Sequence, residues 1–211
     1  MVRSRKELEI LLSKVPYLIS PSIALEQYLC DSSVASELLW MAHMYEGIVG
    51  KSVVDLGCGT GRLSYGALLL GAKDVICVDI DVKALNVAKV FLVSEGFNNI
   101  HFVNADVNFL DIKNIDTVVM NPPFGVYKKG LDIVFLKKAL EFKPKAVYTI
   151  HKYNPESHIL IYRTVQNEGY TIRNMLVRFM SIGAVYPKHR KRIHRFKVSM
   201  YAISRYRGIY V

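Results

Sequence analysis

The chain has 211 residues, of which 51% are apolar, and its 28 lysines and arginines outnumber its 18 aspartates and glutamates, giving a formal net charge of +10. This length fits one domain, or one domain with a short extension, and the apolar fraction is enough for a full core. No apolar run is long enough to span a membrane and no secretory signal pattern opens the sequence, so we expect no membrane association.

The three cysteines are Cys30, Cys58 and Cys77. Their number is odd, and their spacing matches neither a disulfide framework nor a metal clamp. We therefore expect no metal site, and a reducing, cytoplasmic setting is the default interpretation.

Helix and strand patterns alternate along the chain, which favours an α/β fold with a parallel sheet covered by helices on both faces. Helices are expected over residues 8–15, 32–45, 63–70, 82–94, 131–142 and 156–167. Strands are expected over residues 52–56, 75–78, 100–103, 115–120, 146–150, 171–180 and 196–204. We expect five parallel strands followed by an antiparallel hairpin.

A glycine-rich turn follows the first expected strand, where residues 55–61 read DLGCGTG. Glycine lets the backbone turn sharply and approach a ligand, and the helix after the turn presents free N–H groups. The spacing is G-x-G-x-G, whereas dinucleotide enzymes use G-x-G-x-x-G. Asp79 closes the second strand, where a carboxylate can accept ribose hydroxyls, and Asp106 follows the third, where one can bind an adenine amino group. These features predict a nucleotide-type ligand at the carboxyl ends of the strands.

A second motif, Asn121-Pro122-Pro123-Phe124, follows the fourth expected strand. The Asn121 side-chain carbonyl and the Pro122 backbone carbonyl can each accept one N–H of an exocyclic amine, which orients the amine and stabilises positive charge developing on it. The two prolines stiffen the loop, and Phe124 can stack on a base. The motif therefore predicts methylation of an amine.

The excess positive charge is concentrated in residues 188–197, which contain six lysines and arginines. Such a cluster favours a polyanion, and we expect a nucleic acid. The expected RNA contacts are Lys128, Lys129, Lys152, Lys188, Arg190, Lys191 and Arg192.

The glycine-rich turn resembles the nucleotide-binding motif of class I S-adenosylmethionine methyltransferases, and the similarity spans about residues 51–150. The resemblance implies a Rossmann-like, mostly parallel seven-stranded sheet with a reversed last strand, and S-adenosylmethionine as cofactor. The catalytic residues expected are Asn121, Pro122, Pro123 and Phe124. The expected cofactor-binding residues are Gln27, Tyr28, Asp55, Gly57, Cys58, Gly59, Gly61, Leu63, Asp79, Ile80, Asp106, Val107 and Asn121.

The Asn121–Phe124 motif is shared by adenine-N6 enzymes of DNA and RNA, guanine-N2 enzymes and the glutamine methyltransferases of release factors. Further residues narrow this set: Leu25-Glu26-Gln27-Tyr28, the lysines after Gly125, Tyr148-Thr149-Ile150-His151-Lys152 and the basic run from His189 to Arg192. Together they resemble the methyltransferase-like enzymes that place N6-methyladenosine on small-subunit ribosomal RNA. Glutamine N5 in protein and adenine N6 in DNA remain the alternative acceptors.

The chain departs from this family at one point, and the resemblance also implies a partner. That family has Pro and Thr after the Gln-Tyr pair, whereas this chain has Leu29 and Cys30, so a threonine contact to the cofactor cannot carry over. The family works with a small zinc-ribbon activator subunit, and residues 100–103 would form an edge strand suited to pairing with it. We expect residues 1–46 to form a helical extension that lines the cofactor site, and residues 47–211 to form the methyltransferase domain.

Overall fold

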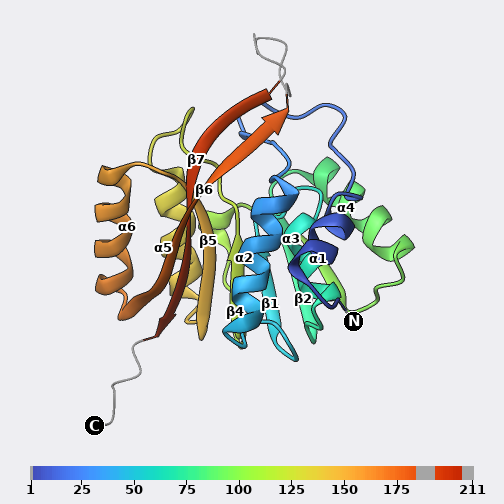
Figure 1. The fold of residues 1–211 in the computed structure, drawn as a ribbon, viewed down its shortest axis with the longest axis horizontal. Coiled ribbons are helices and arrows are strands. Elements are labelled where there is room, and N and C mark those ends of the chain that lie inside the picture. Colours follow the sequence, from blue (N-terminus) through green and yellow to red (C-terminus); the bar gives the residue numbers. More distant parts are fainter. Residues whose placement is uncertain (1, 184–192, 206–211) are drawn as a thin grey trace.

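The structure is a computed structural model of the chain, and it describes residues 2–183 and 193–205. Helices and strands alternate over most of these ranges (Figure 1). The strands are β1 (Ser52–Leu56), β2 (Asp74–Asp79), β3 (Ile100–Asn104), β4 (Thr117–Met120), β5 (Ala146–Lys152), β6 (Tyr170–Gly183) and β7 (Ile193–Arg205). The helices are α1 (Arg5–Leu12), α2 (Ser32–Met44), α3 (Arg62–Leu69), α4 (Val82–Ser94), α5 (Leu131–Glu141) and α6 (Pro155–Asn167), with a 3-10 turn η1 (Val107–Phe109).

All seven described strands form one sheet in the order β3-β2-β1-β4-β5-β7-β6. The pairs among β1 to β5 are parallel, whereas β7 runs antiparallel to both of its neighbours, β5 and β6. This topology is the one that the class I methyltransferase resemblance predicted, and the expected fold is confirmed. Strand β3 lies at one edge of the sheet, as the sequence predicted.

The core lies on both faces of the sheet because successive residues of a strand point to opposite faces. Val53 packs with α1, α2, α3 and α4, whereas its neighbour Val54 packs with α5 and α6. The same alternation separates Val119 from Val118 on β4. Figure 1 shows α1, α2 and α3 in front of the sheet and α6 at the left of the view. Within the described ranges, every helix is too short or too polar to cross a bilayer.

Side-chain caps explain where several helices begin. Asp31, Asp81 and Asn154 each accept a hydrogen bond from the backbone N–H two residues later, at the start of α2, α4 and α6. Helix α1 differs from its expected range because it begins under the Ser4 cap and ends at Leu12, before Val15. Val15 still packs in the core, which explains why the apolar pattern extended the expected helix.

The cysteine spacing gave no sign of a disulfide, yet the structure joins Cys58 to Cys77 in one. Parallel pairing of β1 with β2 sets Asp55 beside Cys77, so residues 19 apart in sequence meet at the glycine-rich turn. Spacing alone did not reveal the pair because the contact depends on strand order. Cys30 is a buried free thiol, and burial raises its pKa to about 12.

Candidate active site

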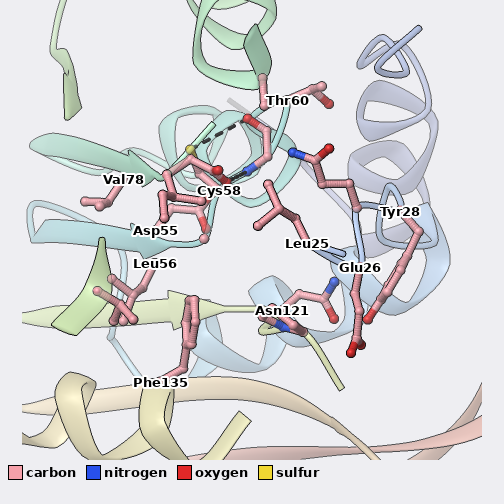
Figure 2. A pocket seen from close by; sticks show the side chains of 18 of the residues that line it. Leu25, Glu26, Tyr28, Asp55, Leu56, Cys58, Thr60, Val78, Asn121 and Phe135 are labelled. Atoms are coloured by element: carbon pink, nitrogen blue, oxygen red, sulfur yellow. Dashed lines mark hydrogen bonds between the residues drawn. The ribbon is translucent and has the colours of Figure 1, made fainter. Parts of the chain in front are cut away.

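A cavity of about 280 Å³ opens at the carboxyl ends of β1, β2 and β4. Strands β1 and β4 flank the point where the strand order reverses, the usual ligand position in open α/β sheets. Figure 2 shows Asp55, Leu56 and Val78 on the strand side of the cavity, and Glu26 and Tyr28 on the opposite side. The segment between α1 and α2 therefore forms one wall of the cavity.

The glycine-rich turn brings backbone atoms to the cavity. Gly57 and Gly59 have φ values of 77° and 56°, a region that side chains disfavour, and a Cβ on Gly59 would meet nothing within 4 Å. The Gly59 N–H donates to Asp79 at 2.8 Å, which fixes the turn against the end of β2. Open space in front of Gly59 leaves room for a ligand.

Gly61 has a structural role in helix packing. It lies outside the cavity lining, and a Cβ there would come within 3.0 Å of Leu92 and 3.2 Å of Ala88 on α4. Glycine at this position therefore allows α3 to begin in close contact with α4.

Three carboxylates lie in a row at the strand ends. Asp79 accepts from Gly59 and from the Asp81 N–H at 2.9 Å, and burial raises its pKa. Asp106 caps η1 by accepting from the Asn108 N–H at 2.8 Å, and it also lines the cavity. Asp55 lies nearest to β4 and is the most deeply buried of the three.

Asp55 is only 1% exposed. One carboxylate oxygen accepts from the Ser64 N–H at 2.8 Å and from the Ser64 hydroxyl at 2.7 Å. The other oxygen is buried and has no hydrogen-bond partner among the described residues. Burial raises the pKa of Asp55 to about 7, against the opposing effect of the Ser64 hydrogen bonds. A cationic group in the cavity would satisfy the unpaired oxygen and stabilise the charged form.

This pKa predicts a pH-dependent stability. The folded carboxyl holds its proton up to about pH 7, whereas the unfolded one loses it near pH 4. The stabilising contribution is therefore complete below about pH 4 and is lost as pH rises through 7. We expect the wild-type protein without cofactor to lose unfolding free energy relative to Asp55→Asn between pH 5 and pH 8, by on the order of a few kcal/mol, as measured by urea denaturation.

The control is Asp111→Asn, since Asp111 is exposed and forms an ion pair with Lys113 at 3.6 Å. The free energy of unfolding of this variant should differ from that of wild type by a constant amount over the same pH range. A constant difference for Asp55→Asn as well would contradict the raised pKa.

The Asn121–Phe124 motif lies directly after β4. Asn121 lines the cavity, and its side-chain oxygen is buried with no hydrogen-bond partner in the part of the chain that the structure describes. Figure 2 places Asn121 between the strand ends and the wall that carries Glu26 and Tyr28. A buried amide oxygen without a donor is costly, so this site is built for a donor that a ligand brings.

The rest of the motif supports that position. Pro122 is buried, Pro123 lines the cavity, and the ring of Phe124 lies 5.4 Å from that of Tyr28 and 5.6 Å from that of Phe196 on β7. These aromatic contacts join the catalytic loop to the wall segment and to the hairpin of β6 and β7.

Polar contacts fix the loop at two further points. Glu26, which is buried, accepts from the Tyr127 N–H at 2.9 Å. Asp132, at the start of α5, lies 3.1 Å from Nδ1 of the fully buried His151, whose Nε2 lies 3.0 Å from the Thr149 hydroxyl. The loop between Asn121 and α5 is therefore attached to the wall segment at Tyr127, and the start of α5 is attached to β5 through Asp132 and His151.

Most of the expected cofactor residues do line this one cavity. They are Gln27, Tyr28, Asp55, Gly57, Cys58, Gly59, Leu63, Asp79, Ile80, Asp106, Val107 and Asn121. Of the expected RNA contacts, Lys128 lines the cavity, Lys129 follows it in the chain and is exposed, and Lys152 is exposed at the end of β5. Lys188, Arg190, Lys191 and Arg192 lie outside the described residues.

The sequence analysis missed one charged residue of the cavity wall, Arg62. It begins α3, is only 4% exposed, and its guanidinium donates to the backbone carbonyl groups of Cys30 and Val15. Its Nε is buried without a partner among the described residues, and burial lowers its pKa. The signal was its place directly after Gly61, at a helix start that faces ligands in such folds.

Comparisons with known proteins agree with this geometry. Residues 31–142 match the model of the methyltransferase small domain. The chain belongs to this methyltransferase family. It is a class I S-adenosylmethionine-dependent methyltransferase, and S-adenosylmethionine is its cofactor.

This methyltransferase is also homologous to rRNA N(6)-adenosine-methyltransferases. The METTL5 enzyme of Danio rerio is 39% identical over 73% of this chain and 77% of its own length. The Mettl5 enzyme of Drosophila melanogaster is 39% identical over 73% of this chain and 75% of its own length. A crystal structure from Pyrococcus horikoshii, described as that of a proposed RNA methyltransferase, superposes with a TM-score of 0.90 at 40% identity over 97% of this chain and 99% of that one.

Proposed function

We propose that this protein transfers a methyl group from S-adenosylmethionine to the exocyclic N6 of an adenosine in RNA, with small-subunit ribosomal RNA as the substrate. The observation that carries the proposal is the buried side-chain oxygen of Asn121, which has no donor among the described residues and faces the cofactor cavity. An amine N–H of the acceptor supplies that donor.

The relatives support RNA over protein as the acceptor. The rRNA adenosine methyltransferases of zebrafish and fruit fly align with 73% of this chain. Ribosomal protein L11 methyltransferases, by contrast, align with only 21–34% of it. The similarity to the rRNA adenosine methyltransferases therefore extends over more than twice as much of the chain.

In this proposal the cofactor lies along the cavity at the strand ends. In this proposal Asp106 binds the adenine amino group and Asp79 the ribose hydroxyls, as their places at the ends of β3 and β2 favour. The methionine end is a zwitterion, and in this proposal it meets Asp55 Oδ1 and Arg62 Nε, two buried polar atoms with no partner among the described residues. The unpaired Asp55 oxygen binds the ammonium group of the cofactor, and the Arg62 guanidinium binds its carboxylate.

The catalytic residues act by positioning. The bound cofactor supplies an electrophilic methyl group, so no strong general base is required. Asn121 Oδ1 and the Pro122 carbonyl hold the two amine hydrogens and turn the nitrogen lone pair toward the methyl group. Phe124 stacks on the adenine, and the contacts of its ring with Tyr28 and Phe196 keep it in place. Lys128, Lys129, Lys152 and the basic run from Lys188 to Arg192 bind phosphates around the target.

The test is methyl transfer from labelled S-adenosylmethionine to ribosomal RNA, DNA and a protein extract offered in parallel, with a zinc-ribbon activator present. The labelled product is then digested and identified. We expect N6-methyladenosine from RNA alone. Label in methylglutamine or in DNA would overturn the acceptor while leaving the cofactor site intact.

We further propose that a small zinc-ribbon activator pairs with β3. The Val75 N–H donates to the Asn99 carbonyl at 3.0 Å, and the Ala105 N–H donates to the Asp79 carbonyl at 3.1 Å. Because donors alternate along a parallel ladder, the Phe102 N–H points away from β2 toward the open edge. That group is available to a strand of another chain.

Phe102→Pro removes this outward N–H and leaves the hydrogen bonds to β2 in place. We expect it to weaken activator binding at least about ten-fold in isothermal calorimetry. The matched control is Phe102→Ala, which deletes the ring and keeps the N–H, and it should bind more tightly than the proline variant. Equal binding by wild type and Phe102→Pro would exclude pairing at this edge.

A further inference from the structure

The hairpin of β6 and β7 extends beyond the sheet on the side of the active site. Strand β5 pairs with β7 only as far as Lys152, opposite Val198. Residues 193–197 therefore continue past the end of β5, and their strand partners are residues 179–183 of β6. We call these two segments the hairpin stem, and Figure 1 shows it rising above the other strands. The expected strands, 171–180 and 196–204, were shorter than β6 and β7. The side chains on the outer face of the stem do not pack in the core, so the alternating apolar pattern of a buried strand is lost there.

One face of the stem is held firmly against the protein. Met180 is fully buried, and the Ser181 N–H donates to Asp31 at 3.2 Å. Just below the stem, Arg178 binds Glu37 through two hydrogen bonds of 2.7 and 2.9 Å. Phe196 contacts Phe124 of the catalytic motif. The stem is thus a rigid continuation of the active-site wall.

The opposite face carries an unusual group of side chains. Phe179 is 52% exposed, the guanidinium carbon of Arg195 lies 4.5 Å from the centre of its ring, and Nζ of Lys197 lies 5.7 Å from it. Neither cation forms an ion pair with any residue in the described ranges. Two uncompensated positive charges beside an exposed aromatic ring fit a ligand that is both anionic and aromatic.

Stacking on Phe179 prepares Arg195 for such a ligand. A guanidinium that lies over a ring has lost part of its rotamer freedom before binding, and its N–H groups remain usable. Nucleobases of single-stranded RNA stack on arginine planes, and arginine and lysine both bind phosphates.

The position relative to the active site is suitable as well. Arg195 and Lys197 flank Phe196, whose ring contacts Phe124, and the Lys197 carbonyl accepts from the Tyr153 N–H at 3.0 Å, next to Lys152. Because neighbouring residues of a strand point to opposite faces, a strand whose target base stacks on Phe124 would pass around the edge of the hairpin to reach Arg195 and Lys197.

We propose that Phe179, Arg195 and Lys197 form a contact site for the single-stranded RNA that flanks the target adenosine. Arg195, backed by Phe179, stacks on a neighbouring base, and Lys197 binds a phosphate. This inference rests on RNA being the substrate.

The experiment measures binding of a short single-stranded RNA with one adenosine by fluorescence anisotropy, at several salt concentrations, using the full chain. Phe179→Ala keeps every charge, and we expect about ten-fold weaker binding with an unchanged salt slope. Arg195→Lys should weaken binding similarly, because it keeps the charge and loses the plane. Arg195→Gln should weaken binding and also lower the salt slope by about 0.7.

The matched controls lie on α6, where Tyr162 and Arg163 are exposed. Tyr162→Ala and Arg163→Gln should bind RNA as wild type does, and all variants should bind S-adenosylmethionine equally. Wild-type affinity in both Phe179→Ala and Arg195→Lys, in a protein that methylates RNA, would overturn this contact site alone. A wild-type protein that modifies DNA or protein instead of RNA would overturn the proposed function and this inference with it.

Discussion

Asn121→Ala is expected to lower kcat for methyl transfer by about 10²- to 10³-fold while it leaves the dissociation constant of S-adenosylmethionine nearly unchanged. The Asn121 oxygen is buried without a donor among the described residues, and its proposed partner is the amine of the acceptor. In this proposal alanine removes a contact to the reacting nitrogen, while the cofactor keeps its other contacts in the cavity.

The size of the effect follows from the chemistry of the amine. In the free base its lone pair is delocalised into the ring, and positive charge develops on nitrogen as the methyl group is transferred. An acceptor placed before the reaction stabilises that charge without reorganisation, which is why a single lost contact of this kind has a large effect. The two quantities are measured by single-turnover methyl transfer and by isothermal calorimetry with the cofactor.

Asn121→Asp is the informative companion, since it keeps an acceptor oxygen at the same place. We expect it to lose less kcat than Asn121→Ala. The control is Asn167→Ala at the exposed end of α6, which should leave both quantities as in wild type. Equal loss of cofactor binding and catalysis in Asn121→Ala would contradict a role at the amine.

Local sequence patterns predicted those parts of the molecule that depend on neighbouring residues. The turn at residues 55–61 and the Asn121–Phe124 motif each follow a strand directly, so their place at the carboxyl edge of the sheet could be stated before the structure. The capped helices α2 and α4 were predicted to within a residue or two for the same reason. The sheet order came from the family resemblance, and the structure confirms it.

The parts that were missed depend on contacts between distant segments. Cys58 and Cys77 are joined only because β1 and β2 are neighbours in the sheet. The burial of Arg62 depends on the segment between α1 and α2, whose carbonyl groups at Val15 and Cys30 accept its hydrogen bonds. The length of the hairpin stem depends on pairing between β6 and β7 where no third strand supports them. The local pattern around the two cysteines and the hairpin stem does not distinguish them from ordinary core or surface positions, and the place of Arg62 directly after Gly61 does not show that it is buried.

The second large effect concerns Arg62. Arg62→Leu is expected to weaken binding of S-adenosylmethionine by about 10- to 100-fold, because a charge-assisted hydrogen bond to the cofactor carboxylate is lost from a buried position. Its affinity for 5′-methylthioadenosine, which lacks the amino-acid end, should stay within about three-fold of wild type. Both affinities are measured by isothermal calorimetry.

Comparing the affinities for the two ligands distinguishes a lost contact to the cofactor carboxylate from a distorted cavity. Arg62 also ties the wall segment to α3 through the carbonyl groups of Val15 and Cys30, so its loss can distort the cavity. A distorted cavity would weaken both ligands alike, whereas a lost carboxylate contact weakens only the ligand that has a carboxylate. Arg62→Lys keeps the charge without the planar fork, and it should recover part of the affinity for S-adenosylmethionine. Parallel loss of both ligands in Arg62→Leu would make Arg62 an anchor of the wall segment and leave the cofactor carboxylate to another partner.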